Sequence, residues 1–275
     1  MIRMMQPADL PALKALWAAA FGDSADYAEM AISRFAGPQN VCVAEEDGAP
    51  VGLLLAVPVQ LGARQGVYDC GLAVAPEYRR RGIGAALLAF AHAAAAARGC
   101  SFAALVPEQP SLFAWYEKQG FTRAFGLRRV HRSIRRNIWS QAEFDSVPAK
   151  RLCDLRREYC PDIVQMSPAA MVQELTDLYS RGITIVSSED GYGLYFRKGE
   201  TLHFVELMAE GDRAAERLME AAREKEVVVE DAEITVGANQ NLFLGEGRRE
   251  DHGMIRFFGE PFDVSESYLR LMLDV

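Results

Sequence analysis

The stretch that decides the fold reads Leu72-Ala73-Val74-Ala75-Pro76-Glu77-Tyr78-Arg79-Arg80-Arg81-Gly82-Ile83-Gly84-Ala85-Ala86-Leu87-Leu88. An apolar run that ends at Val74 and stops at Pro76 is typical of a buried strand. A basic loop with two glycines follows, and the alanine-rich residues 85–97 predict a helix. The order strand, basic loop, helix places the unpaired N–H groups of a helix start beside a loop with little side-chain bulk.

Such a loop is suited to holding a phosphate group. The start of a helix offers free N–H groups and the positive end of the helix dipole. Gly82 and Gly84 let a ligand approach the backbone, and the arginines at 79–81 add positive charge. We interpret the loop as a diphosphate cradle. The loop lacks the Gly-Lys-Ser/Thr of an ATP-binding loop, and Leu87 stands where a dinucleotide fingerprint needs glycine. Both differences argue against ATP and NAD as its ligands.

A second segment reads Gln109-Pro110-Ser111-Leu112-Phe113-Ala114-Trp115-Tyr116-Glu117-Lys118-Gln119-Gly120-Phe121. Together the two segments resemble the GNAT acyltransferase superfamily across roughly residues 1 to 130. The first matches its motif of Arg or Gln, two residues, Gly, any residue, then Gly or Ala, through Arg79, Gly82 and Gly84. The second resembles the family's short helix with Tyr-Glu-Lys and Gly-Phe. Gln109 stands where relatives often carry Asn, which puts one pantetheine or helix-capping hydrogen bond in doubt.

The resemblance implies that acetyl-CoA is the co-substrate. It also assigns roles to particular residues. Tyr116 is the catalytic acid that protonates the departing thiolate. The strand that ends at Val74 is expected to splay from the strand near 101–106, so that its backbone pairs with pantetheine. The cofactor-binding residues implied in this way are Leu72, Ala73, Val74, Arg79, Arg80, Arg81, Gly82, Ile83, Gly84, Ala85 and Gln109.

The implied reaction is direct attack of a primary amine on the thioester, without a covalent enzyme intermediate. Backbone N–H groups near Val74 would stabilise the developing oxyanion. The amine must lose a proton, and three candidates for the base stay open: Asp69, Glu77 and a water held by backbone carbonyls. Both carboxylates are more often ordinary surface or loop acids.

The remaining pattern of the first half predicts a mixed α/β domain. Apolar spacing indicates helices from Leu10 to a stop at Gly22 and over residues 24–35. An Asp-Gly turn at 47–48 predicts a hairpin. Strands are expected at 1–6, 41–45, 51–59, 66–74, 101–106 and from 121, and a short helix at 110–119.

The second half repeats the order of strand meander, helix and strand, and we interpret it as a degenerate GNAT-like domain. Residues 206–213, Glu-Leu-Met-Ala-Glu-Gly-Asp-Arg, hold the place of the first motif, but two acids and one glycine make a poor pyrophosphate site. This half is expected to shape the acceptor groove. We place an acyl-CoA-binding domain at residues 1–135 and the degenerate domain at 140–275. Helices are expected at 140–158, with Ser140 and Glu143 as its start signals, 168–181 and 212–225, and strands at 183–187, 191–197, 201–208, 232–236, 254–258 and 268–273.

Composition limits the partners. Thirty Lys and Arg against 38 Asp and Glu give a formal charge of -8, which argues against nucleic acid and anionic membranes. No secretory signal or membrane span is evident, and five scattered cysteines suggest free thiols in a reducing cytoplasm. No metal site is expected, and structural or exposed roles are favoured for the histidines. The arginines near the middle of the chain are expected to pair with carboxylates. The histidines are His92, His131, His203 and His252. The arginines are Arg128, Arg129, Arg132, Arg135 and Arg136.

The sequence therefore predicts a cytoplasmic N-acetyltransferase that transfers acetyl from acetyl-CoA to an amine on a small molecule or peptide. A non-catalytic acyl-CoA-binding or regulatory protein is the alternative. An aminoacyl transferase of peptidoglycan assembly is a second alternative, and the intact basic glycine loop argues against it.

Overall fold

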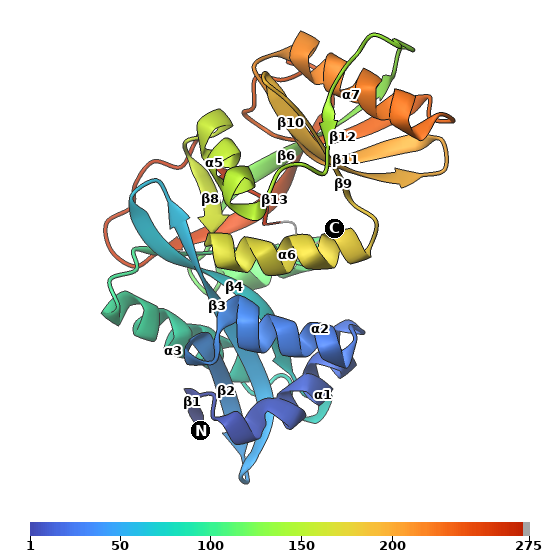
Figure 1. Cartoon of the computed structure of the whole chain (residues 1–275). Coiled ribbons are helices and arrows are strands. Elements are labelled where there is room, and N and C mark those ends of the chain that lie inside the picture. The colour runs from blue at the N-terminus through green and yellow to red at the C-terminus, as the bar shows by residue number, and fades with distance from the viewer. Residues whose placement is uncertain (272–275) are drawn as a thin grey trace. The chain divides into compact units, whose positions relative to one another are not determined.

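The computed structural model covers the whole chain and describes residues 1–271 (Figure 1). The chain divides into two compact units. The first comprises residues 1–123, 165–173 and 253–263, and the second comprises residues 124–164, 174–252 and those from 264 onward. Each unit combines helices with a sheet that contains both parallel and antiparallel pairs.

The first unit has five strands in the order β1-β2-β3-β4-β5, and residues 254–257 of strand β13 add a further antiparallel pairing to β5. The β2–β3 and β3–β4 pairs are antiparallel, whereas β4 and β5 are parallel. The elements up to residue 121 are β1 (Ile2–Met4), α1 (Leu10–Phe21), α2 (Ala25–Met30), β2 (Val41–Glu46), β3 (Ala49–Leu61), β4 (Arg64–Val74), α3 (Ile83–Ala97), β5 (Phe102–Leu105) and α4 (Phe113–Glu117).

Helix α1 buries Leu13 and Trp17, one turn apart, and ends at Gly22 in the left-handed conformation. Ser24 begins α2 because its hydroxyl accepts a hydrogen bond from the N–H of Tyr27 at 3.1 Å. A π-helical turn, Ala31–Ala36, continues α2. The helices predicted at both places are therefore present.

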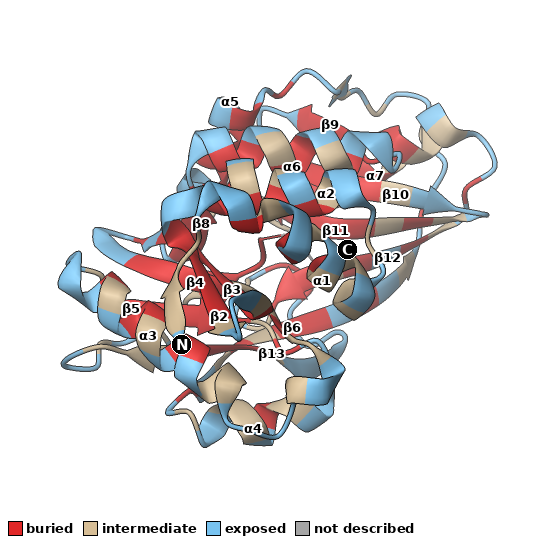
Figure 2. Ribbon diagram, turned by 90° about the horizontal axis from the view of Figure 1, so that it is seen from below, coloured by how far each residue is buried: buried red, intermediate tan, exposed pale blue. Residues whose placement is uncertain are grey.

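Two helical layers cover the sheet of the first unit. Leu87, Leu88 and Ala91 of α3 share one apolar cluster with Leu54 and Ala56 of β3. Successive residues of a strand point to opposite faces of the sheet, so the residues of β3 next to Leu54 and Ala56 point to the other face. On that face α1 packs against β3 and β4. Buried residues accordingly follow the strands and the sides of the helices that face them (Figure 2).

From residue 122 the chain is mostly in the second unit, where the strand order is β6-β12-β11-β10-β9-β7. The pair β11–β12 is parallel and the other pairs along this path are antiparallel. The elements are β6 (Thr122–Ser133), β7 (Glu143–Phe144), α5 (Ala149–Tyr159), β8 (Ile163–Met166), α6 (Pro168–Ser180), β9 (Thr184–Ser188), β10 (Gly191–Lys198), β11 (Thr201–Ala209), α7 (Asp212–Glu226), β12 (Asp231–Gly237), β13 (Arg248–Phe257) and β14 (Tyr268–Leu269).

A fully buried ion pair lies inside the second unit. Arg156 of α5 binds Glu206 of β11 through two guanidinium nitrogens, with Nε–Oε1 at 3.0 Å and Nη2–Oε2 at 2.9 Å. The hydroxyl of Tyr192 donates to the same carboxylate at 2.9 Å. Both charged side chains are completely excluded from solvent, so removal of either partner would leave a buried charge unpaired.

Arg128 organises a loop of the second unit. Its guanidinium donates hydrogen bonds of 2.8 to 3.3 Å to five backbone carbonyls, and the side chain is almost completely buried. The acceptors are Ala238, Gln240, Leu242, Phe243 and Glu246. The expectation of carboxylate partners was therefore wrong for Arg128.

Three other arginines of the same group do meet carboxylates, as expected. Arg129 pairs with Glu250 at 3.4 Å, Arg132 with Glu216 at 3.1 Å and Arg136 with Glu224 at 3.8 Å. These pairs are partly exposed, so each contributes little to stability.

The mixed α/β class is confirmed, and the differences from the sequence predictions lie in the second half. The helix predicted to start near Ser140 begins at Ala149, because Pro148 is its N-cap and Glu143 lies in strand β7. Strand β8 was not predicted. Strand β13 starts at Arg248 rather than 254, and β14 ends at Leu269, with residues 272–273 of the predicted strand outside the described residues.

Burial of Cys42 in β2 predicts a pH-dependent loss of stability. Burial, and then the nearby Asp69, raise the pKa of the Cys42 thiol from about 9 to about 12. The folded state therefore disfavours the thiolate, so this contribution to stability is complete below pH 9 and is lost as the pH rises toward 12. Between pH 8 and pH 10 we expect the Cys42→Ala variant to lose about 1 kcal/mol less unfolding free energy than the parent. Urea unfolding at both pH values measures the difference, and equal losses would contradict the prediction.

Candidate active site

The parallel strands β4 and β5 part after three residue pairs. Gly66, Val67 and Tyr68 pair with Phe102, Ala103 and Ala104, and β4 then continues to Val74 alongside β3 alone. This edge of β4 beyond Tyr68 is left without a strand partner among the described residues. The structure therefore contains the splay that the family resemblance implied.

A bulge marks the point where β4 turns from its neighbour. Gly71 has a φ of +63°, and the register against β3 shifts between Leu53 and Leu55. A Cβ at Gly71 would lie 2.2 Å from the ring of Trp17, so the close approach of α1 requires glycine here.

Val74 directs its backbone toward the open edge. The N–H of Ala75 bonds the carbonyl of Val51 in β3 at 2.8 Å, and successive residues of a strand alternate in direction. The carbonyl of Val74 instead accepts a hydrogen bond of 2.9 Å from Nε of Arg79. The first arginine of the basic loop thus lies at the end of the parted strand.

Helix α3 starts at Ile83 with Gly82 as its N-cap, and Gly82 has a φ of +79°. Ala86 is bonded to the carbonyl of Gly82 at 3.0 Å, so the preceding helical N–H groups of residues 83–85 lie in the unpaired first turn. A Cβ built on Gly82 meets no atom within 4 Å, which shows open space at this point. Residues 79–82 are exposed. An anion can reach the helix start from solvent.

The other glycine of the loop has a different local setting. A Cβ on Gly84 would make ordinary contacts with Trp115 at 3.6 Å and Leu72 at 3.9 Å. The protein itself therefore leaves room for alanine at this position. Arg81 is held by the carbonyl of Glu77 at 2.9 Å and lies over the ring of Tyr78.

Tyr116 is half-buried in α4 and packs edge-on against two rings. Its ring centroid lies 4.8 Å from that of Trp115 and 5.7 Å from that of Phe121. Burial first, and then the charges of Asp69, Cys70 and Glu108, raise the pKa of Tyr116 well above its ordinary value. The phenol therefore stays protonated at neutral pH, as a proton donor must.

A buried acid–base pair lies in the same part of the first unit. His92 Nε2 of α3 and Asp69 Oδ2 of β4 are 2.6 Å apart, and both side chains are at least 96% buried. The His92 ring also contacts Phe121, whose ring touches Tyr116. The interpretation of Asp69 as an ordinary surface acid was wrong, and sequence alone missed its pairing with His92. The two residues are 23 positions apart on different elements, which leaves no spacing signal.

Two other predicted residues lie at the surface. Glu77 sits exposed in the single helical turn Pro76–Tyr78, and no partner of its carboxylate is present among residues 1–271. Gln109 caps the turn Pro110–Leu112 through its backbone carbonyl, with no capping bond from its side chain. The structure brings the basic loop and the start of α4 into one unit but assigns neither of these side chains a contact with the other site residues.

The second unit has the corresponding parting of strands without the basic loop. Strand β11 pairs with β12 only from Thr201 to Phe204 and then continues to Ala209. Only residues 210 and 211 separate β11 from α7, whereas residues 75–82 separate β4 from α3. The side chain of Gln240 donates to the carbonyl of Leu207 at 3.2 Å and accepts from the N–H of Gly237 at 2.6 Å.

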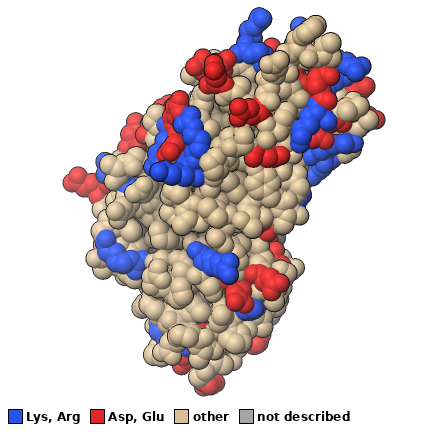
Figure 3. Space-filling view, in the orientation of Figure 1, with Lys and Arg blue, Asp and Glu red and all other residues tan. Residues whose placement is uncertain are grey.

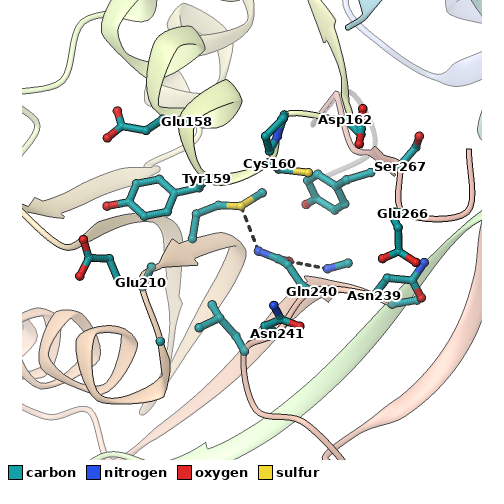
Figure 4. Close-up of a pocket in the computed structure, with 18 of the residues that line it drawn as sticks. Glu158, Tyr159, Cys160, Asp162, Glu210, Asn239, Gln240, Asn241, Glu266 and Ser267 are labelled. Carbon is teal, nitrogen blue, oxygen red and sulfur yellow. Dashed lines mark hydrogen bonds between the residues drawn. The ribbon is translucent and has the colours of Figure 1, made fainter.

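A cavity of about 580 Å³ lies in this part of the second unit (Figure 4). Gln240 projects into it, with Glu210 on one side and Glu266 on the other. Four carboxylates and no Lys or Arg belong to its lining. A pyrophosphate would meet repulsion here, in agreement with the sequence interpretation of a poor site.

Surface features bear on other function classes. On the face shown in Figure 3, basic side chains form small groups interspersed with acidic ones. No helix of the described chain is long and apolar enough to cross a membrane. Within residues 1–271 no group of three or more His, Cys, Asp or Glu is arranged to hold a metal ion.

Comparisons with known proteins place this geometry in a class. The Acetyltransferase (GNAT) domain family matches residues 37–123. A GCN5-related N-acetyltransferase from Kribbella flavida has a TM-score of 0.74 at 17% identity, with 94% of this chain and 70% of that chain covered. Eis1 from Mycobacterium abscessus has a TM-score of 0.68 at 16% identity, with 94% and 73% covered. No curated protein sequence matches the chain.

A tandem GNAT protein from the clavulanic acid biosynthesis pathway is also similar, with a TM-score of 0.53 at 15% identity and coverage of 95% of this chain and 100% of that chain. At these identities the solved structures show the fold alone. The parted parallel strands and the glycine loop before α3 define the class as a GNAT fold. Residues 37–123 thus match the GNAT acetyltransferase domain, and the solved structures with the same fold extend over most of the chain.

The buried Asp69–His92 pair predicts a specific stability effect. Asp69→Asn keeps the shape of the side chain but removes the charge-assisted hydrogen bond, so we expect a loss of about 1–3 kcal/mol in unfolding free energy. Urea unfolding at pH 7 measures it. The control is Asp47→Asn in the exposed β2–β3 turn, which should change stability by less than about 0.5 kcal/mol. Equal small effects in both variants would contradict the proposed strength of the pair.

Proposed function

We propose that the protein is an N-acetyltransferase that transfers acetyl from acetyl-CoA to a primary amine. The observation that carries the proposal is the open edge of β4, which ends at Val74 beside an exposed basic loop and the unpaired start of α3. Backbone amides along the edge suit the extended, amide-bearing pantetheine arm. The helix start and the arginines at 79–81 suit the pyrophosphate.

The reaction that fits these groups is direct aminolysis of the thioester. The neutral amine nitrogen forms a bond to the acetyl carbonyl carbon, and the carbon–sulfur bond then breaks. Backbone N–H groups near Val74 are suited to hydrogen-bond the oxyanion that develops between these steps. The sulfur leaves as thiolate and takes the proton of the Tyr116 hydroxyl, and the proton released by the amine restores the phenol through solvent.

The remaining roles follow from the same proposal. The cofactor contacts are Leu72, Ala73, Val74, Arg79, Arg80, Arg81, Gly82, Ile83, Gly84, Ala85 and Gln109, with Gln109 contributing at most through its exposed side chain. Asp69 is engaged by His92 and buried, which disfavours it as the base that meets an incoming amine. A water held by backbone carbonyls then remains with Glu77 as a candidate.

The acceptor is proposed to be an amine on a small molecule or a peptide, and the site of action the cytoplasm. We propose the domain division at residues 1–135 and 140–275, with acyl-CoA binding confined to the first domain. The acidic cavity beside Gln240 supports this restriction.

The cradle predicts a sharp binding defect. Gly82→Glu places a carboxylate in the open space before α3, so we expect acetyl-CoA affinity to fall at least about 100-fold, through repulsion of the pyrophosphate and blocked N–H groups. Isothermal titration calorimetry with acetyl-CoA measures the affinity.

The matched control is Gly48→Glu in the β2–β3 turn. Gly48 has the same φ of +79° and equally open space for a Cβ, so the two variants carry the same backbone strain and added charge. Gly48→Glu should bind acetyl-CoA as the parent does. Equal affinity in the parent and in Gly82→Glu would refute the cradle.

The proposed role of Tyr116 predicts that its loss slows turnover without weakening acetyl-CoA binding. Tyr116→Phe keeps the ring contacts but removes the acid, so kcat should fall about 10²- to 10⁴-fold with acetyl-CoA affinity nearly unchanged. Steady-state kinetics with an amine found by screening provides the measurement, with Tyr179→Phe, an exposed site in α6, as the control. Unchanged kcat in Tyr116→Phe would assign the acid elsewhere.

A non-catalytic acyl-CoA-binding protein is the alternative function. It shares the cradle and predicts the same binding defect in Gly82→Glu. The two functions differ in turnover, because a binding protein would release no free thiol from acetyl-CoA with any amine. The presence of Tyr116, a protonated phenol in the same apolar cluster as Leu72 and Val74 of β4, favours the enzyme.

A further inference from the structure

A second cavity of the second unit is lined by a buried arginine, Arg270, that has no carboxylate partner in the described part of the chain. This cavity has a volume of about 550 Å³. Arg270, which directly follows β14, lines it and is only 6% exposed. The other lining residues belong to the same unit and come mainly from β6, β10, β11 and β12: Arg129, Val130, His131, Phe196, Lys198, His203, Phe204, Val205, Glu233, Ile234, Thr235 and His252.

The Arg270 guanidinium forms neither a hydrogen bond nor an ion pair within residues 1–271, and its buried Nε has no acceptor. A charged group removed from water without a partner destabilises the folded state. Arg156, by contrast, is completely buried but pairs with the carboxylate of Glu206. Arg270 therefore stands out as a buried cation that lines a cavity and lacks an anionic partner within residues 1–271.

Hydrogen bonds hold the backbone at Arg270 and in the strand just before it. Arg156 donates a hydrogen bond from Nη2 to the backbone carbonyl of Arg270 while it binds Glu206. The strand pairing of Tyr268 and Leu269 with β8 holds the residues just before it. These contacts fix the backbone from which the Arg270 side chain enters the cavity.

The surrounding charges favour an anion. Three cationic side chains line the cavity, Arg129, Lys198 and Arg270, against the single carboxylate of Glu233. That carboxylate is already engaged by His203 Nδ1 at 3.0 Å. Arg129 pairs with Glu250 at the surface, which leaves Lys198 and Arg270 as the cations available to a ligand.

The sheet itself forms the floor of the cavity. His131 of β6 pairs in register with Glu233 of β12, which in turn pairs with His203 of β11. These polar side chains share one face, whereas their neighbours Val130, Ile234 and Phe204 pack on α7 in the apolar core of this unit. Imidazole N–H groups on the polar face add hydrogen-bond donors for an oxyanion.

We propose that this cavity binds a small anion that carries a phosphate or carboxylate group, with Arg270 as its principal ligand. Arg270 offers planar donors that match the oxygens of either group, and Lys198 adds a second positive charge at the rim. The proposal is independent of the acetyl-CoA site and concerns only residues of the second unit.

Titration calorimetry of the full chain with inorganic phosphate and, separately, with succinate tests it in a chloride buffer. We expect one of the two anions to bind with a dissociation constant below about 1 mM. Arg270→Gln should weaken that binding at least about tenfold, and Lys198→Gln several-fold. Lys150→Gln, an exposed lysine of α5, is the control and should bind as the parent does.

The outcomes separate clearly. Phosphate binding alone identifies a phosphate-bearing ligand, and succinate binding alone a carboxylate-bearing one. No binding of either anion by the parent, or equal weakening in Lys150→Gln and Lys198→Gln, would overturn the proposal. If Arg270→Gln fails to fold by circular dichroism, Lys198→Gln decides. Gly82→Glu should bind the anion normally, so failure at the acetyl-CoA site leaves this test intact.

Discussion

The parting of β4 from β5 is the constraint on which the candidate site depends. Parallel strands normally stay paired because each unpaired N–H and C=O costs free energy when it is buried. Here pairing stops at Tyr68 and Ala104, and the bulge at Gly71, pressed against Trp17, turns β4 away. The backbone of β4 near Val74 is thereby left with hydrogen-bonding capacity that an extended ligand can use.

Strands β11 and β12 of the second unit also part, but a side chain of the protein bonds to the unpaired edge. The side chain of Gln240, from the segment after β12, donates a hydrogen bond to the carbonyl of Leu207 on the part of β11 that does not pair with β12, and so partly replaces the missing strand. With the loop reduced to residues 210–211, the first turn of α7 is close to the end of β11, and Asp212 accepts a hydrogen bond from the N–H of Phe243. The first turn of α7 therefore carries a carboxylate where α3 is preceded by arginines, which makes this helix start unfavourable for a phosphate.

Sequence patterns predicted what depends on local order along the chain. The glycine and arginine spacing at 79–84 gave the loop before α3, and the aromatic segment around Tyr116 gave α4, because in each the recognisable residues lie within one turn or loop. The helix start at Ser140 failed because Pro148 and the short strand β7 override a plausible cap. The pairs Asp69–His92 and Arg156–Glu206 could not be predicted, since each joins residues on different elements whose proximity only the folded chain creates.

Arg128 has a consequence for how the second unit assembles. Five carbonyls of residues 238–246 converge on one guanidinium from β6, much as oxygen ligands surround a bound cation, yet the central charge is tethered more than a hundred residues earlier in the chain. That segment can acquire its shape only after β6 has docked, which makes it a late event with a long loop to close. Its amide protons should then exchange only when the whole unit opens, so this irregular stretch would be as slow to exchange as the central strands.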